Sequence, residues 1–204
     1  RAQVLEWLLL RMKKIVITYD QFLDGEVDLI KALIKNGLYA VHIRKHESSL
    51  EEMEAFVLKF DSFHRAFFVM CSHRSLVDKY GMKGMHFSSH EEVPDERQDW
   101  YTYSTSCHTL EQVTSNKDKV DYVLLSPIFD SIAKPGYISS WKDRKELTNA
   151  LMNHNGCEVM ALGGVVEDKL KDVKHMCFDG YAMLGSIWMP LLNKANNKNL
   201  AIKD

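Results

Sequence analysis

Histidine recurs along the sequence where short apolar runs give way to polar residues. Six of the nine histidines occupy such positions, namely His42, His46, His73, His86, His90 and His108. An imidazole can exchange protons near neutral pH, hydrogen-bond a substrate, or bind a transition metal such as Zn²⁺. A metal site would be indicated by an HxH or HExxH spacing, which the sequence lacks. Histidines that contact a substrate or lie in solvated loops are therefore favoured over a metal site.

Eight runs are predicted as β-strands, because each is a short run of β-branched or other apolar residues closed by polar or turn residues. They cover Ile15–Tyr19, Tyr39–Ile43, Phe67–Cys71, Gly84–Phe87, Tyr101–Thr105, Tyr122–Ser126, Val159–Leu162 and Gly180–Leu184. Stretches of helical period separate them, at Val27–Lys35, Leu50–Phe60, Arg74–Tyr80, Leu110–Thr114, Asp143–Met152, Asp168–Met176 and Ile187–Ala195.

This alternation of strands and helices predicts an α/β protein with a parallel sheet, since each parallel connection needs a crossover. Eight units with no mid-chain reversal favour a single parallel (β/α)₈ TIM barrel. A doubly wound open sheet is the alternative, but Asp20–Gly25, which follows the first strand, carries no GxGxxG fingerprint. Residues 12–204 are predicted to form the barrel, and residues 1–11 an N-terminal extension outside it.

The composition is that of an ordinary folded domain, with 46% of its 204 residues hydrophobic and 26% charged. The net charge of −2 predicts no binding to nucleic acid. Val4–Leu10 is much shorter than the roughly 20 apolar residues of a membrane span, so no membrane partner is expected. The four cysteines form no CxxC pair, which predicts free thiols and a cytoplasmic location. A homodimer remains open.

Two glycine sites follow the seventh and eighth predicted strands, at Gly163-Gly164 and Gly185-Ser186. Parallel barrels often bind a phosphate on these two loops, because bare backbone N–H groups and a helix N-terminus face the anion. Either site alone could be an ordinary tight turn. Together, and in register with the strand count, they favour a phosphate site.

Three segments carry a resemblance to a known family. Asp121–Gly136 reads DYVLLSPIFDSIAKPG, Met160–Val165 reads MALGGV, and Tyr181–Ile187 reads YAMLGSI. The combination resembles the thiamine phosphate synthase and TenI superfamily, over about Lys13 to Leu192. The resemblance implies a barrel of thiamine biosynthesis that binds a thiazole phosphate. The phosphate would lie on the glycine loops, with charge from nearby cations. These residues are Gly163, Gly164, Gly185, Ser186, Lys134 and Arg44.

Other family positions are replaced. The synthase has Q-x-R-x-K after its second strand, where this chain keeps Arg44 and has His42 and His46 at the outer places. These two histidines, and His86 at the histidine of the family's VHLG segment, are expected to contact substrate. The Mg²⁺-binding Asn-Asp of the synthase corresponds to Cys71-Ser72, so the aspartate is missing. Glu91 is the remaining acidic candidate for a metal ligand.

The segment Ser106-Cys-His108-Thr-Leu-Glu keeps a pattern shared across the family. In TenI-type thiazole tautomerases, the histidine at this position moves the proton that aromatises a thiazole carboxylate phosphate. The resemblance thus implies His108 as the acid/base, with Arg44 and Lys134 completing the catalytic set. A helix-capping or backbone-bonding role for His108 is the alternative.

Three functions follow from the resemblance. The favoured one is a thiazole tautomerase that requires no cofactor. The second is a thiamine phosphate synthase that couples thiazole phosphate to hydroxymethylpyrimidine pyrophosphate with Mg²⁺. Here Glu91 would bind the metal, and Ser106, Ser131 and Lys134 the pyrophosphate. The third is a non-catalytic regulator that binds thiazole phosphate or thiamine phosphate.

Overall fold

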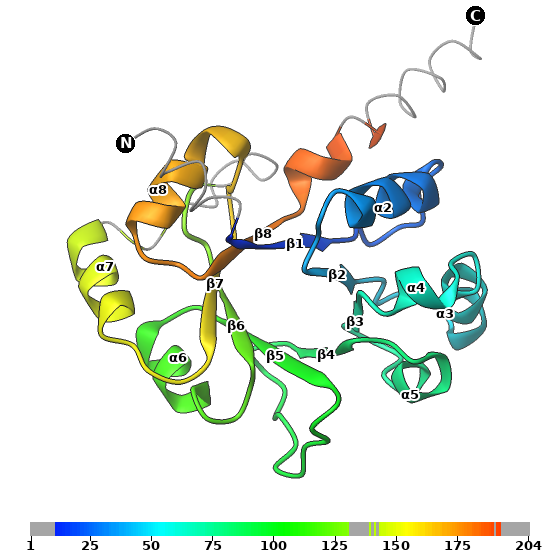
Figure 1. Cartoon of the computed structure of the whole chain (residues 1–204), viewed down its shortest axis with the longest axis horizontal. Coiled ribbons are helices and arrows are strands. Elements are labelled where there is room, and N and C mark those ends of the chain that lie inside the picture. Colours follow the sequence, from blue (N-terminus) through cyan, green and yellow to red (C-terminus); the bar gives the residue numbers. More distant parts are fainter. Residues whose placement is uncertain (1–10, 131–138, 140, 142, 190, 193–204) are drawn as a thin grey trace, which may run out of the picture.

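The computed structural model describes residues 11–130, 139, 141, 143–189 and 191–192. Eight parallel strands form a closed barrel in the order β1 to β8, with β1 paired to β8, so the predicted (β/α)₈ barrel is confirmed (Figure 1). The strands are β1 (Lys13–Ile17), β2 (Ala40–Ile43), β3 (Phe68–Met70), β4 (Gly84–Phe87), β5 (Thr102–Cys107), β6 (Tyr122–Leu125), β7 (Glu158–Ala161) and β8 (Gly180–Met183). Closure excludes the doubly wound alternative. Residues 1–10 of the predicted extension lie outside the described residues.

Helices surround the strands (Figure 1). They are α2 (Glu26–Lys35), α3 (Leu50–Val57), α4 (Ser62–Arg65), α5 (Leu76–Tyr80), α6 (Leu110–Asn116), α7 (Arg144–Met152), the 3₁₀ helix η1 (Glu167–Lys169) and α8 (Leu170–His175). A further helical segment follows β8, at residues 185–189 and 191–192. Each predicted helix therefore has a counterpart among the described residues.

Local capping explains one difference from the predicted boundaries. Ser49 and Glu52 form a capping box that begins α3. The predicted helix Leu50–Phe60 instead ends at Val57, and a new helix begins after Asp61. The Asp61 carboxylate accepts a hydrogen bond from the His64 backbone N–H at 3.0 Å, which satisfies a free donor of the new first turn.

Alternate residues of the strands pack into the barrel interior. The apolar interior cluster consists of Ile15, Ile17, Ala40, Val69, Tyr122, Leu124, Met160 and Ala182. Because strand side chains alternate in direction, His42 lies on the same side of β2 as Ala40. The interior therefore combines an apolar layer with polar side chains nearer the carboxyl ends of the strands.

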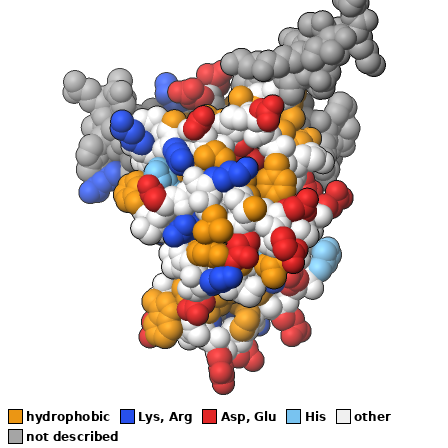
Figure 2. Space-filling view, turned by 90° about the vertical axis from the view of Figure 1, so that its right-hand side faces the viewer, with side chains coloured by type: hydrophobic (Ala, Val, Ile, Leu, Met, Phe, Trp, Pro, Cys, Tyr) orange, Lys and Arg blue, Asp and Glu red, His pale blue; other side chains and the backbone are white. Residues whose placement is uncertain are grey.

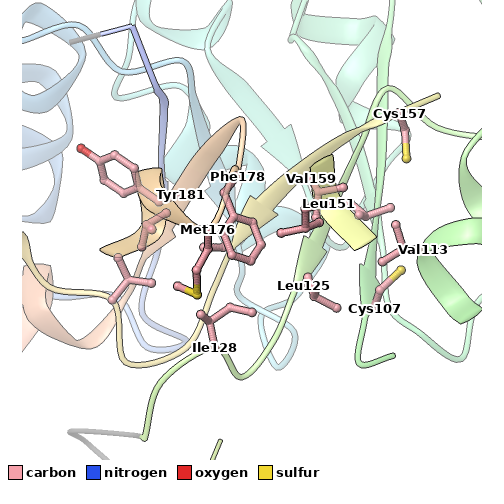
Figure 3. Close-up of a cluster of buried hydrophobic side chains, with 14 of the residues drawn as sticks. Cys107, Val113, Leu125, Ile128, Leu151, Cys157, Val159, Met176, Phe178 and Tyr181 are labelled. Atoms are coloured by element: carbon pink, nitrogen blue, oxygen red, sulfur yellow. The ribbon is translucent and has the colours of Figure 1, made fainter. Parts of the chain in front are cut away.

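The remaining strand residues pack outward against the helices. Figure 3 shows part of this outer core, in which Leu125 and Val159 of the sheet lie near Val113 of α6 and Leu151 of α7. A second outer cluster joins β1–β3 to α2, α3 and α5 and includes the fully buried Trp188. The indole N–H of Trp188 donates to the Ile17 carbonyl at 2.6 Å and ties the last helical segment to β1.

The surface carries both charge signs. Figure 2 shows basic and acidic side chains interspersed over the face it presents. No helix within the described part of the chain is long and apolar enough to cross a membrane. All four cysteines are free, and Cys177 is the exposed one.

Candidate active site

A cavity of about 320 Å³ opens at the carboxyl ends of the strands. Its walls combine aliphatic side chains with histidines, one arginine and one glutamate. The lining residues are Ile17, His42, Arg44, His46, Cys71, His86, Ser88, Glu91, Ser106, Leu124, Leu162 and Leu184. Active sites of parallel barrels occur at this end. The structure therefore brings six predicted site residues together: His42, Arg44, His46, His86, Glu91 and Ser106.

His42 lies at the floor of this cavity and is fully buried. Its Nε2 lies 2.5 Å from the hydroxyl of Tyr122, which projects from β6. Burial, followed by repulsion from a protonated His86, holds the pKa of His42 well below its ordinary value. His42 is therefore a neutral hydrogen-bonding group at physiological pH.

His86 lies beside it, with its ring centroid 4.8 Å from that of His42. Its Nδ1 and Nε2 each lie 2.9 Å from a serine hydroxyl, those of Ser104 and Ser106. Burial, and then the positive charge of Arg74, lowers the pKa of His86 to about 3. Ser106 thus contacts the cavity while its hydroxyl also orients a neutral imidazole.

Arg44 and His46 form the rim of the cavity after β2. Asp20 joins them, because its carboxylate lies 3.5 Å from Arg44 Nη1 and accepts from the His46 backbone N–H at 3.0 Å. Lys45, between them in sequence, points the other way and is fully buried. Its Nζ donates to the Glu26 carboxylate and to the backbone carbonyls of Tyr19 and Gln21, each at 2.9 Å, which fixes the loop after β1.

Glu91 reaches the cavity from the loop after β4 but is already paired. Its carboxylate lies 2.9 Å from Arg74 Nη2 and accepts from the Ser88 backbone N–H at 2.7 Å. The end of β3 contributes Cys71 and Ser72 in place of carboxylates. The described residues contain no group of three or more His, Cys, Asp or Glu that could hold a metal ion. This donor set does not fit a Mg²⁺ site.

His108 directly follows β5 and lines a separate hollow together with Glu111 and Trp141, not the main cavity. Its side chain is exposed, and Nδ1 donates to the Ser126 carbonyl at 2.9 Å. The backbone bond of the alternative interpretation is therefore present, whereas Thr109, not His108, caps α6. The bond fixes the neutral tautomer that leaves Nε2 with its lone pair.

The glycine loops of β7 and β8 lie side by side, since the Ser186 hydroxyl donates to the Val165 carbonyl at 3.4 Å. Gly163 and Gly164 both have positive φ. A Cβ on Gly164 would lie 2.3 Å from the Asp130 carbonyl oxygen, so the pair lets the loop after β6 pack closely. Gly185 begins the last helical segment. Phosphate binding at these loops stays a prediction. Ser131 and Lys134 lie outside the described residues.

Similarity to known proteins agrees with this geometry. The family model described as thiamine monophosphate synthase (TMP-TENI) matches residues 15–187. The chain belongs to the thiamine monophosphate synthase family. A thiamine phosphate pyrophosphorylase from Bacteroides thetaiotaomicron is 30% identical, with a TM-score of 0.74 over 87% of this chain and 85% of that one. No curated protein sequence matches the chain significantly.

More distant structures show the barrel fold. A thiamine phosphate pyrophosphorylase from Pyrococcus furiosus is 19% identical, with a TM-score of 0.69 over 87% of this chain and 88% of that one. The 3-hexulose-6-phosphate synthase from Salmonella typhimurium is 10% identical, with a TM-score of 0.59 over 84% and 89% of the two chains. The family model covers the sequence motifs, and the solved structures share the barrel fold of this chain.

Three residues at the site were missed by sequence reasoning. Tyr122 was read as part of a strand, although its two-residue spacing from the cavity-lining Leu124 signals an inward position. Lys45 and Arg74 were assigned no role from the sequence. Their roles depend on partners 19 and 17 residues away, Glu26 and Glu91, and no local motif signals such pairs.

Proposed function

We propose that this family member is a thiazole tautomerase that acts on a thiazole carboxylate phosphate by proton transfer, without a cofactor. The supporting observation is the hydrogen bond from His108 Nδ1 to the Ser126 carbonyl. A carbonyl can only accept, so Nδ1 is the donor of this bond, and in the neutral imidazole Nε2 is then the nitrogen that can act as a base. His108 is also exposed at the carboxyl end of the barrel, where a bound substrate can reach it.

An isomerisation is suited to one such base. One proton leaves a carbon of the substrate and a proton returns at another atom of the conjugated system, so composition and charge are unchanged. His108 Nε2 accepts the first proton and donates the second. Neutral His42 and His86 are poorly suited to this step, because their lowered pKa values make their conjugate acids unstable. His86 holds the Ser106 hydroxyl and Tyr122 fixes His42, so both rings are assigned to the cavity wall that the substrate contacts. His46 at the rim is assigned to a hydrogen bond with the substrate.

Anion binding is assigned to the cations and the glycine loops. Arg44 lines the cavity, and its guanidinium can bind a carboxylate or phosphate through two parallel hydrogen bonds. Gly163, Gly164, Gly185 and Ser186 are proposed to hold the substrate phosphate, with Lys134 nearby. A thiazole carrying both anions would span these groups.

The alternative is thiamine phosphate synthase, which the family model and the names of the two pyrophosphorylases favour. That reaction expels pyrophosphate and uses Mg²⁺ held by carboxylates. Cys71 and Ser72 offer no carboxylate, and Glu91 is bound to Arg74. The synthase is therefore ranked second, and a non-catalytic regulator that binds thiazole or thiamine phosphate third.

The purified chain should be incubated with thiazole carboxylate phosphate, and separately with thiazole phosphate plus hydroxymethylpyrimidine pyrophosphate, each with Mg²⁺ or EDTA. We expect isomerisation at equal rates in both conditions of the first reaction. Thiamine phosphate formed only with Mg²⁺ would establish the synthase instead. Binding without turnover of either mixture would leave the regulator.

A pair of histidine variants tests the assigned base. His108→Gln should lower kcat by about 10²–10⁴-fold, the usual contribution of a general acid/base. His154→Gln is the matched control, because His154 Nε2 also donates to a backbone carbonyl at 2.9 Å, that of Cys157 just before β7. It should retain the wild-type kcat. Equal rates in both variants would remove His108 from the mechanism.

A further inference from the structure

Arg74, in the loop between β3 and α5, connects the ends of two neighbouring strands. Its Nη2 donates to the carbonyl oxygen of His86 at 2.7 Å and to that of Cys71 at 3.3 Å. Its Nε also donates to the His86 carbonyl, at 3.2 Å. The guanidinium carbon lies 4.2 Å from the centroid of the Phe87 ring. These contacts hold the planar guanidinium between β3 and β4.

The same guanidinium binds the carboxylate of Glu91. Arg74 Nη2 lies 2.9 Å from Oε1 and 3.1 Å from Oε2. Glu91 is in turn fixed by the Ser88 backbone N–H, so both oxygens have donors. One positive charge therefore meets one negative charge and two carbonyl dipoles at the edge of the cavity.

Carbonyl and carboxylate oxygens are the ligands that a hard divalent cation would need at this place. Here the oxygens of Cys71, His86 and Glu91 are already bound by the guanidinium. A divalent cation would have to displace Arg74 or share its ligands with a like charge. The family's Mg²⁺-binding positions correspond to Ser72 and Glu91, so this competition occurs where the metal is expected.

We infer that Arg74 is a positioning residue that takes the place of a divalent cation between β3 and β4. Its guanidinium holds Glu91 and the two strand ends in the arrangement that forms this wall of the cavity. The wall is organised without metal, whichever thiazole reaction the cavity carries out. The inference therefore does not depend on the tautomerase proposal and needs no turnover to be tested.

Mn²⁺, which is paramagnetic and replaces Mg²⁺ at oxygen sites, is the probe. Its electron paramagnetic resonance signal should be titrated with the full chain, with and without inorganic pyrophosphate. A loss of this signal reports bound Mn²⁺. Wild type and Glu91→Gln should lose equal amounts of signal, because Arg74 is already paired with the Glu91 carboxylate and any Mn²⁺ then binds elsewhere on the chain. A loss of signal that requires Glu91 would overturn the inference.

Removing the guanidinium makes the opposite prediction. Arg74→Ala should bind Mn²⁺ about tenfold or more tightly than wild type, because it removes a like charge from beside the oxygens that would bind the ion. The gain should disappear in Arg74→Ala/Glu91→Gln. A folded Arg74→Ala, shown by its thermal melt, with wild-type Mn²⁺ affinity would contradict the inference. If Arg74→Ala does not fold, the inference is tested by comparing Mn²⁺ binding of wild type with that of Glu91→Gln.

Arg97→Ala is the matched control. Arg97 also pairs with a carboxylate, that of Asp121 at 2.7 Å, and lies over an aromatic ring, that of Tyr103 at 4.8 Å. Its side chain is 27% exposed, against 26% for Arg74. Asp121 precedes β6 and so lies at the opposite end of the barrel. This variant should bind no more Mn²⁺ than wild type, and equal gains in both variants would count against Arg74.

Discussion

The hydroxyl of Tyr122 and Nε2 of His42 lie 2.5 Å apart inside the barrel, and both side chains are fully buried. They come from β6 and β2, which are not neighbours in the sheet. The other ring nitrogen of His42, Nδ1, has no hydrogen-bond partner among the described residues. This nitrogen is itself buried, so among the described residues the Tyr122 hydroxyl is the group that hydrogen-bonds the ring.

Tyr122→Phe should therefore lower the free energy of unfolding by about 1–3 kcal/mol, because it leaves His42 Nε2 buried without a partner. Urea denaturation measures the change. Tyr101→Phe is the control, since its hydroxyl bonds the exposed carboxylate of Asp78 and water can replace it. Equal losses in the two variants would mean that burial of the His42 pair has no special cost.

His86 should make stability depend on pH. Its folded pKa of about 3 lies below the ordinary value of 6.5, so between these values the unfolded chain binds a proton that the folded chain does not. The stabilisation is complete above pH 6.5 and is lost as pH falls, by up to about 1.4 kcal/mol per pH unit. Urea titrations from pH 7.5 to 4 should show a shallower decline for His86→Gln than for wild type. Parallel declines would refute the depressed pKa.

The buried pair of Lys45 and Glu26 should be strongly coupled. Lys45→Met leaves the Glu26 carboxylate buried without its partner, which should cost about 3–5 kcal/mol of unfolding free energy. Lys45→Met/Glu26→Gln should recover part of that loss, because no unpaired charge remains. For comparison, Arg144→Met removes the exposed pair with Asp172 and should cost about 0–1 kcal/mol. A double variant no more stable than Lys45→Met would argue against the coupling.

Gly164 should tolerate a methyl group worse than Gly81 does. The two residues have nearly the same φ, +62° and +61°, so alanine at either position should lower the free energy of unfolding by roughly 1–2 kcal/mol. At Gly81 nothing lies within 4 Å of the added Cβ, whereas at Gly164 the Asp130 oxygen lies at 2.3 Å. Gly164→Ala should cost roughly 1–3 kcal/mol more, as overpacking does. Equal melting temperatures would show that the loop after β6 moves freely.

Strand and helix order followed from the sequence because both signals are local. Runs such as Ile15–Tyr19 are too short and too β-branched for helices, and caps such as Ser49 act within one turn. Eight repeats of one unit then left few topologies. The segments from Asp121, Met160 and Tyr181 likewise indicated the family, since motif positions are fixed within one strand-loop unit.

Partnerships across the barrel were decided by tertiary structure alone. Closure brings His42 to Tyr122 across 80 residues of chain and encloses His86 between two serines, and this burial, not residue type, lowers its pKa. The family resemblance made Glu91 a candidate metal ligand, and the fold pairs it with Arg74 instead. Residue types and local periodicity determined the scaffold and the available chemistry. Distances and burial depend on the whole tertiary structure, and they determined which side chains are paired and which can contact a substrate.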